Sequence, residues 1–336
     1  MNDLLSSPIL SPYAEKLREI SRIIATAESI HIVSTADLEG VLSLTQIEAG
    51  LLDSVRPYKR RILPSKKNVP RDEELDFDKF DGLVILVEPF HEPISTISSE
   101  NVIHITPLNA TVKFSSSDKE HHGAIDCVTI CAVIAQLLSP EGVRVRRQRG
   151  MMLAGTWLRQ NLDTNYAPIM SALRDHLDEE GSIDIRPLPE VKNPIVSMIP
   201  GLSERFLLRI SKSWDSLNID ERSSALSDLV LPTLTHSGLS TMRLEELIWH
   251  RVLLPGCDID LASQLYSAKE NWPDDSNSSR IHASNVADNL KLNSNVDNLE
   301  LENLCNELGL DNLLKKLPEG LNTLLRERGG NLSSGE

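Results

Sequence analysis

The chain has 336 residues, of which 40% are hydrophobic and 25% are charged, and its formal net charge at pH 7 is -15. This length allows two domains and part of a third, and the charge argues against a wholly basic surface that coats nucleic acid. No apolar run approaches the ~20 residues that cross a bilayer, and the N-terminus lacks the basic and apolar regions of a signal peptide. A cytoplasmic protein without a membrane segment is therefore expected.

The first part of the chain alternates predicted helices and strands. Residues 12–28 carry apolar side chains at helical spacing, which predicts a surface helix. Residues 30–52 begin with a run rich in Ile and Val, typical of a buried strand, and continue from Gly40 at helical spacing. Later segments predict strands at 58–64, 82–87 and 102–106, a polar loop at 65–78, a helix at 124–138, and a short helical or strand-like segment at 151–162. This alternation predicts an α/β domain over residues 1–165, with a parallel, doubly wound sheet.

The second part of the chain is dominated by helical patterns. Residues 166–270 are expected to form a helical extension of the first domain, with helices at 169–177, 202–212, 222–230, 244–254 and 259–268. Residues 271–280 are polar and rich in helix breakers, which predicts a linker. A third region, residues 281–336, is again predicted to be helical.

Cysteine usage indicates a reducing compartment. The four cysteines are scattered, at positions 127, 131, 257 and 305. Cys127 and Cys131 lie four residues apart on a predicted helix and therefore share a face. A buried apolar pair is the favoured interpretation over a metal site, because no second pair completes the ligand set.

Two carboxylates mark the point where the predicted strand of residues 30–52 becomes a helix. Asp37 and Glu39 lie in the turn, directly before Gly40. In an open α/β sheet, the strand ends and the helix N-termini converge at such points, so a functional site is expected there.

The turn Thr35-Ala36-Asp37-Leu38-Glu39-Gly40 resembles the first motif of the DHH phosphoesterase superfamily, where an apolar strand ends in His-x-Asp-x-Asp-Gly. That superfamily includes RecJ-type single-strand exonucleases, archaeal RecJ-like proteins, and a catalytically inactive replication factor that joins GINS to the MCM helicase. The order of the later elements is similar as well, and the resemblance covers roughly residues 12–270. It implies a DHH-like α/β fold.

The resemblance also implies that the metal-binding positions have degenerated. Members of this superfamily hydrolyse phosphodiesters with two divalent metals, usually Mn or Mg, held mainly by carboxylates and imidazoles. Of the matching positions, Asp37 is kept, while Glu39 and Glu88 each replace an Asp. The Asp-His-His motif is replaced by Thr106-Pro107-Leu108, the first His by Thr35, and the last Asp by Arg159. A guanidinium there would repel a cation, and could pair with Glu88 or Asp37 instead.

A different histidine pair occurs in the stretch Asp118-Lys119-Glu120-His121-His122. It precedes a predicted helix and does not follow a strand, so exposed loop histidines are the favoured interpretation over a replacement metal motif. The expected function is therefore that of a catalytically inactive DHH-like binding or scaffold factor in DNA replication or repair, with no metal and no catalytic residue. Its expected partners are single-stranded DNA and replisome proteins such as GINS. The alternative is an active Mn- or Mg-dependent exonuclease or phosphoesterase.

Two basic clusters are candidates for nucleic-acid binding in this acidic chain. The first contains Lys59, Arg60 and Arg61, and the second contains Arg144, Arg146 and Arg147. Such clusters could hold a phosphate backbone. A solvated loop face, or contact with an acidic partner, is an equally weighted interpretation.

The last region resembles a different family. Residues 284–290, 308–310 and 317–323 resemble the helical subdomain of ABC-exporter ATPases, and the run that ends in Ser333-Ser334-Gly335-Glu336 resembles the LSGGQ signature. In that family the signature binds the γ-phosphate of ATP at a helix N-terminus. A third possible function is thus a truncated ABC-transporter ATP-binding protein, as part of a chimera or of a longer fusion.

ATP binding by this chain alone is not expected. No G-x-x-x-x-G-K-[ST] loop occurs in the 336 residues, so nothing in the sequence matches the loop that cradles the β- and γ-phosphates. ATP would be a cofactor only if further sequence completed the ATPase. The two resemblances therefore predict no resident cofactor.

Overall fold

The computed structural model describes residues 4–65, 69–70, 75–91, 101–113, 120–159, 168–235 and 239–292. The chain divides into two compact units, residues 1–288 and 289–336. The fold below is that of the first unit. Most of the second unit, including the signature-like run at Ser333, Ser334, Gly335 and Glu336, lies outside the described residues.

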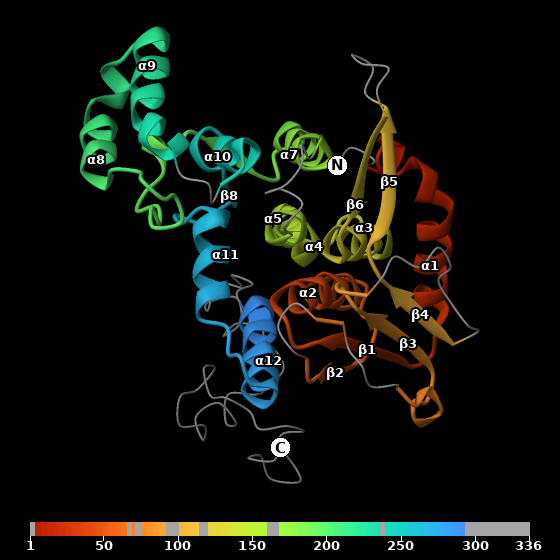
Figure 1. Ribbon diagram of the computed structural model, residues 1–336. Coiled ribbons are helices and arrows are strands. Elements are labelled where there is room, and N and C mark those ends of the chain that lie inside the picture. The colour runs from red at the N-terminus through yellow and green to blue at the C-terminus, as the bar shows by residue number, and fades with distance from the viewer. Residues whose placement is uncertain are drawn as a thin grey trace, which may run out of the picture. The chain divides into compact units, whose positions relative to one another are not determined.

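A four-stranded parallel sheet forms the centre of the first unit (Figure 1). Its strands are β1 (Ile30–Thr35), β2 (Lys59–Leu63), β3 (Leu83–Val87) and β4 (Val102–Ile105), in the order β2-β1-β3-β4. Every residue of β3 is buried, as its unbroken apolar run predicts. The α/β class and the parallel sheet are therefore confirmed.

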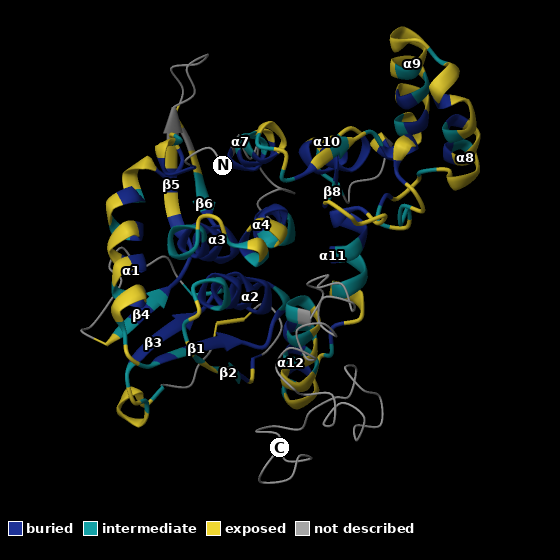
Figure 2. Ribbon diagram, turned by 180° about the vertical axis from the view of Figure 1, so that it is seen from behind, coloured by how far each residue is buried: buried dark blue, intermediate teal, exposed yellow. Residues whose placement is uncertain are grey.

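Helices cover one face of this sheet. α2 (Leu38–Asp53) follows β1 and packs between the sheet and α3 (Cys127–Leu138), and α1 (Ala14–Thr26) packs beside α3. Figure 2 shows α2, α3 and the central strands as the most buried part of the molecule. Ser34 on β1 faces α2, because its hydroxyl donates a hydrogen bond of 2.8 Å to the Gly40 carbonyl.

In a doubly wound sheet, helices also cover the opposite face, but here a connecting segment covers it. There, Val33 and Val84 pack against Leu75 and Phe80 from the β2–β3 connection, which carries only the short helix η3 (Phe77–Lys79) within its described part. Right-handed crossover explains this, because the chain returns across β1 from β2 to β3 on the side away from α2. Helices on both faces, as the sequence analysis predicts, are not seen among the described residues.

An antiparallel hairpin follows the sheet and was not predicted. β5 (Leu108–Lys113) pairs with β6 (Glu120–Ile125). The helix predicted from residue 124 begins instead at Cys127, because Ala124 and Ile125 complete β6. The histidines predicted to lie in a loop belong to β6, and Nδ1 of His122 lies 3.0 Å from the Thr111 hydroxyl oxygen. Asp118 and Lys119 lie outside the described residues.

Three short elements connect the hairpin and α3 to the helical part: α4 (Val143–Gln148), η4 (Arg149–Met152) and α5 (Leu153–Leu158). The helical extension consists of α7 (Pro168–Glu179), α8 (Glu204–Ser213), α9 (Ile219–Val230), α10 (Thr241–Ile248) and α11 (Leu261–Glu270). It has its own apolar core, which includes Leu207, Trp214 and Leu226. The helix predicted over 244–254 ends at Ile248, and Arg251–Leu253 form β8, which pairs with β7 (Asp184–Arg186).

The segment predicted to be a linker packs against the α/β part. Trp272 is buried, and its indole N–H donates a hydrogen bond of 2.9 Å to the carbonyl of Ala36. α12 (Ser276–Leu292) then lies along the sheet edge, where Arg60 of β2 pairs with Asp288 at 2.7 Å. The first compact unit therefore continues to Asp288, past the boundary predicted near residue 270.

The contact between α2 and α3 depends on a glycine. A Cβ atom at Gly50 would lie 2.8 Å from the Ala135 Cα and 3.1 Å from its Cβ. We expect Gly50→Ala to lower the free energy of unfolding by about 2 kcal/mol, because the helices cannot approach as closely. Urea unfolding followed by circular dichroism measures this change.

Ala135→Gly serves as the control for this prediction. Together with Gly50→Ala, it moves one methyl group from α3 to α2. The double mutant should therefore regain part of the free energy of unfolding that Gly50→Ala loses, so the two substitutions should not be additive in a double-mutant cycle. Unchanged stability of the Gly50→Ala protein would contradict the packing described here.

Candidate functional site

The carboxylates singled out from the sequence lie at the carboxyl ends of β1 and β3. Asp37 and Glu39 follow β1, and Glu88 follows β3. The strand order reverses between these two strands, since β2 lies on one side of β1 while β3 and β4 lie on the other. Ligand sites in open α/β sheets form at such a reversal. The sequence therefore placed the candidate site at the expected edge of the sheet.

Asp37 is the N-cap of α2. Its carboxylate accepts a hydrogen bond of 2.8 Å from the Gly40 N–H, which satisfies one of the free donors of the first helical turn. Burial raises the pKa of Asp37, and hydrogen bonds from Thr35 and Gly40 only partly offset this effect. Gly40 is required because a Cβ there would lie 2.7 Å from the Thr35 carbonyl oxygen. The first role of Asp37 is thus to start the helix.

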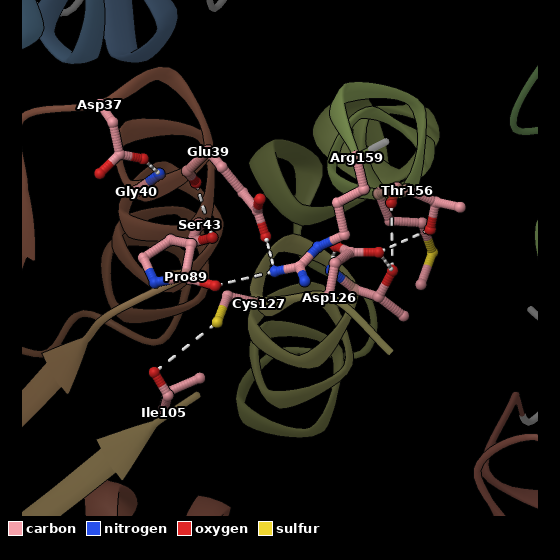
Figure 3. A network of polar contacts seen from close by, with 12 residues as sticks. Asp37, Glu39, Gly40, Ser43, Pro89, Ile105, Asp126, Cys127, Thr156 and Arg159 are labelled. Carbon is pink, nitrogen blue, oxygen red and sulfur yellow. Dashed lines mark hydrogen bonds and ion pairs between the residues drawn. The ribbon is translucent and has the colours of Figure 1, made fainter. Parts of the chain in front are cut away.

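Glu39 forms a buried ion pair with Arg159. A guanidinium nitrogen of Arg159 lies 2.7 Å from the Glu39 carboxylate and also donates to the Pro89 carbonyl at 3.0 Å (Figure 3). The Glu39 side chain is almost completely buried, and that of Arg159 is largely so. The predicted pairing of Arg159 with a carboxylate of this site is confirmed, but the partner is Glu39 and not Glu88 or Asp37.

Glu88 is bound to a histidine. Its carboxylate lies 2.7 Å from Nε2 of His104, a residue of the neighbouring strand β4, and Glu88 itself is buried. The His91 ring packs edge-on against His104, with ring centroids 5.2 Å apart. His104 therefore holds Glu88 toward β4.

Asp126 belongs to the same network and was missed by the sequence analysis. It is 0% exposed and caps α3, where it accepts hydrogen bonds from the Thr129 N–H and hydroxyl, both at 2.9 Å, and from the Thr156 hydroxyl at 2.7 Å. Gly155 allows this approach, because a Cβ there would lie 1.9 Å from the Asp126 carboxylate. An N-cap signal was present in the sequence, since Asp126 stands directly before an apolar helical run.

One guanidinium faces several buried carboxyl groups. The pKa of Glu39 is raised to about 8, chiefly by burial and also by the charges of Asp126 and Asp37, although Arg159 lowers it. For Arg159, burial is the largest single effect and lowers the pKa, but the charge and hydrogen bond of Glu39 together with the charge of Asp126 give a net upward shift. A single cation cannot neutralise several carboxylates in a low-dielectric site. The excess of carboxylates over cations therefore favours uptake of a proton by Glu39 as the pH falls.

These residues do not fit a two-metal centre. Arg159 binds Glu39, the Gly40 N–H binds Asp37, and His104 binds Glu88, so each carboxylate already has a donor. A fixed guanidinium charge beside Glu39 would repel a divalent cation. Within the described part of the chain, no group of three or more His, Cys, Asp or Glu residues is arranged to hold a metal ion.

A small pocket borders the site. Its volume is about 40 Å³, and it is lined by Asp37, Leu38, Glu39, Phe90, Leu158, Lys269 and Trp272. Such a space admits a few water molecules but not a nucleotide. Trp272 brings the end of the helical extension against this site, which the sequence analysis did not predict.

Several residues of the two basic clusters form ion pairs within the protein. Arg60 pairs with Glu48 at 3.5 Å as well as with Asp288. Arg144 pairs with Asp53 at 2.9 Å, and Arg146 pairs with Glu141. Among the described residues, Lys59, Arg61 and Arg147 are exposed and form no ion pair, and Arg61 also lies over the Phe80 ring. The structure therefore does not bring the six predicted residues together as one free surface.

Comparison with known proteins leaves the family open: no protein-family model matches the chain, and no curated protein matches it. None of the helices in the described ranges is long and apolar enough to cross a membrane.

The protonation of Glu39 predicts a specific pH dependence. Its pKa in the folded protein, about 8, lies above the ordinary value of 4.5. The stabilisation from the bound proton is therefore complete below pH 4.5 and is lost as the pH rises through 8. We expect the wild-type protein to lose on the order of 3 kcal/mol between pH 5 and pH 9 relative to Glu39→Gln, whose amide does not titrate.

Urea unfolding at several pH values measures this difference. Glu179→Gln, a substitution at an exposed glutamate of α7, provides the matched control. Its difference from the wild-type protein in free energy of unfolding should not change with pH. A wild-type protein that gains stability over Glu39→Gln as the pH rises would show that Glu39 is ionised in the fold.

Proposed function

We propose that the protein is a catalytically inactive DHH-like factor that acts in the cytoplasm as a binding or scaffold protein in DNA replication or repair. The single observation that carries this proposal is the Arg159–Glu39 ion pair at the carboxyl end of the sheet. The resemblance at residues 35–40 places metal-binding carboxylates at this edge, and a guanidinium now occupies one of the matching positions. In this proposal, the residues of the site stabilise the fold by linking α2 to α5 and to the chain after β3.

The rest of the network supports the same proposal. Hydrolysis of a phosphodiester by metal ions needs carboxylates that are free to coordinate and an open position for water. Asp37 caps α2, Glu88 binds His104, and the neighbouring pocket is too small for a nucleotide. Each of these groups has a structural task that competes with coordination.

Two other functions remain as alternatives. An active Mn- or Mg-dependent exonuclease would require Arg159 to leave Glu39, with the cost of exposing or rearranging buried charges. An ATP-binding fragment rests on residues 281–336, of which residues 293–336 lie outside the described residues. The observations at the β1 and β3 ends favour neither alternative.

The proposed partners are single-stranded DNA and replisome proteins such as GINS. For DNA, the exposed cations Lys59 and Arg61 on the edge strand β2 are the candidates, since Arg60 between them is paired with Glu48 and Asp288. Neighbouring strand residues point to opposite faces, which explains why Arg60 differs from the two residues beside it.

A nuclease assay tests the absence of catalysis. We expect no degradation of a labelled single-stranded DNA oligonucleotide in the presence of Mn²⁺ or Mg²⁺, because Arg159 holds Glu39 away from coordination. Gel electrophoresis of the products measures this. Degradation by the wild-type protein that disappears in Asp37→Ala would overturn the proposal, since it would show that the site coordinates metal.

Fluorescence anisotropy with a labelled oligothymidine tests DNA binding. The affinity should fall with salt, and Lys59→Ala with Arg61→Ala should lower the slope of log affinity against log salt by about 0.7 per lost phosphate contact. Arg144→Ala is the matched control, because Arg144 is already paired with Asp53 and should leave the slope unchanged. A slope that does not respond to loss of Lys59 and Arg61 would exclude β2 as the DNA contact.

A further inference from the structure

The outward face of α8 carries unpaired positive charge. Arg205, Arg209 and Lys212 follow the i, i+4, i+7 spacing of one helical face and are all exposed. None of them forms an ion pair within the described ranges, and the Arg209 guanidinium lies 4.6 Å from the centre of the Phe206 ring. Glu204, at the first position, is the acidic exception on this helix. In a chain with a net charge of -15, this stripe is a local concentration of free cations.

The outward face of α9 has the opposite charge. Asp220, Glu221 and Asp228 are exposed on it. The one cation of this helix, Arg222, points inward, where it donates to the carbonyls of Trp214 and Leu217, both at 3.1 Å. Between the acidic ends, the exposed positions are filled by serine. The two neighbouring helices therefore present a basic face and an acidic face.

Exposed apolar side chains accompany both charged faces. Leu208 on α8 is 57% exposed, between Arg205 and Arg209 in the stripe. Ile219 at the start of α9 is 85% exposed, and Leu231, directly after its end, is 65% exposed. Single exposed apolar residues are common and occur elsewhere in this chain, but these three lie on the same pair of helices as the opposite charges. Figures 1 and 2 show α8 and α9 side by side, with exposed residues along both.

We propose that the α8–α9 pair is a self-association surface that binds a second copy of this chain. The basic stripe of α8 packs on the acidic face of α9 in the second copy, and twofold symmetry repeats the same contact in reverse. Leu208 is then covered by the apolar residues at the ends of the opposing α9. A nucleic acid would meet only the basic stripe, and would leave Leu208 against charged phosphates.

The size of the surface sets the expected strength. Helices of 10 and 12 residues span about 15 and 18 Å. Two such faces bury less than the ~800 Å² per partner of a standard stable interface. The dimer is therefore expected to form in the micromolar range and to weaken with salt, because exposed charge pairs carry much of its specificity.

Analytical ultracentrifugation of the full chain over a range of concentrations tests the proposal. The charge reversal Arg205→Glu with Lys212→Glu on α8 should weaken the dimer by at least about tenfold, because two acidic faces then oppose each other. Asp220→Lys with Asp228→Lys on α9 should do the same with two basic faces. Circular dichroism establishes that both variants remain folded.

A mixture of the two variants tests the proposed pairing of α8 with α9 directly. Each α8 then meets an α9 of opposite charge, so the mixture should recover association to near the wild-type level. The matched control, Lys16→Glu with Arg22→Glu on the exposed side of α1, makes the same change in net charge as the α8 variant and should leave the dimer intact.

Three results would overturn the proposal. The first is a wild-type protein that stays monomeric at every concentration. The second is association that either charge reversal leaves unchanged, or that the mixture fails to restore. The third is an α8 reversal that weakens binding of oligothymidine without affecting association, which would assign the stripe to nucleic acid instead.

Discussion

The buried ion pair between Glu39 and Arg159 is the interaction on which the centre of this structure depends. It joins the first turn of α2 to the residue that ends α5, and through the Pro89 carbonyl it also reaches the chain that leaves β3. Several carboxyl groups crowd around one guanidinium, so the loss of that cation would leave them buried without compensation. Attraction alone does not explain the arrangement, because desolvation opposes it. The pair persists because the surrounding helices and strand ends hold both side chains in place.

The carboxylates around this guanidinium also have structural roles of their own. Asp37 and Asp126 each cap a helix, and Glu88 is bound to His104. A carboxylate that caps a helix or binds a histidine stabilises the fold whether or not it coordinates a metal ion. Arg159 supplies positive charge that the surrounding carboxylates need.

Sequence patterns predicted the elements that show a clear apolar periodicity within their own residues. They missed features that depend on contacts between residues far apart in the sequence. β1, β3 and α2 follow from apolar runs and helical spacing, whereas the pairing of Arg159 with a carboxylate was expected from the resemblance, which aligns Arg159 with a metal-binding position. The β5–β6 hairpin was missed although Leu108, Ala110 and Val112 alternate, because the apolar helical run after residue 124 is the stronger pattern. β8 was included in a predicted helix over residues 244–254. Asp126 was missed, because its contact with Thr156 joins residues 30 positions apart. The segment around Trp272 looked like a linker because its polar neighbours dominate the composition, whereas its burial depends on β1, far away in the sequence.

That contact has a consequence for how the protein is made. The indole of Trp272 binds the carbonyl of Ala36, which lies 236 positions earlier. During synthesis, the sheet and α2 can assemble long before Trp272 leaves the ribosome, since domains fold progressively from the N-terminus. Until then, the carbonyl and the carboxyl-rich turn beside it stay open to solvent. The nascent chain thus passes through a stage in which its strand ends are accessible, and the last part of the first compact unit closes them.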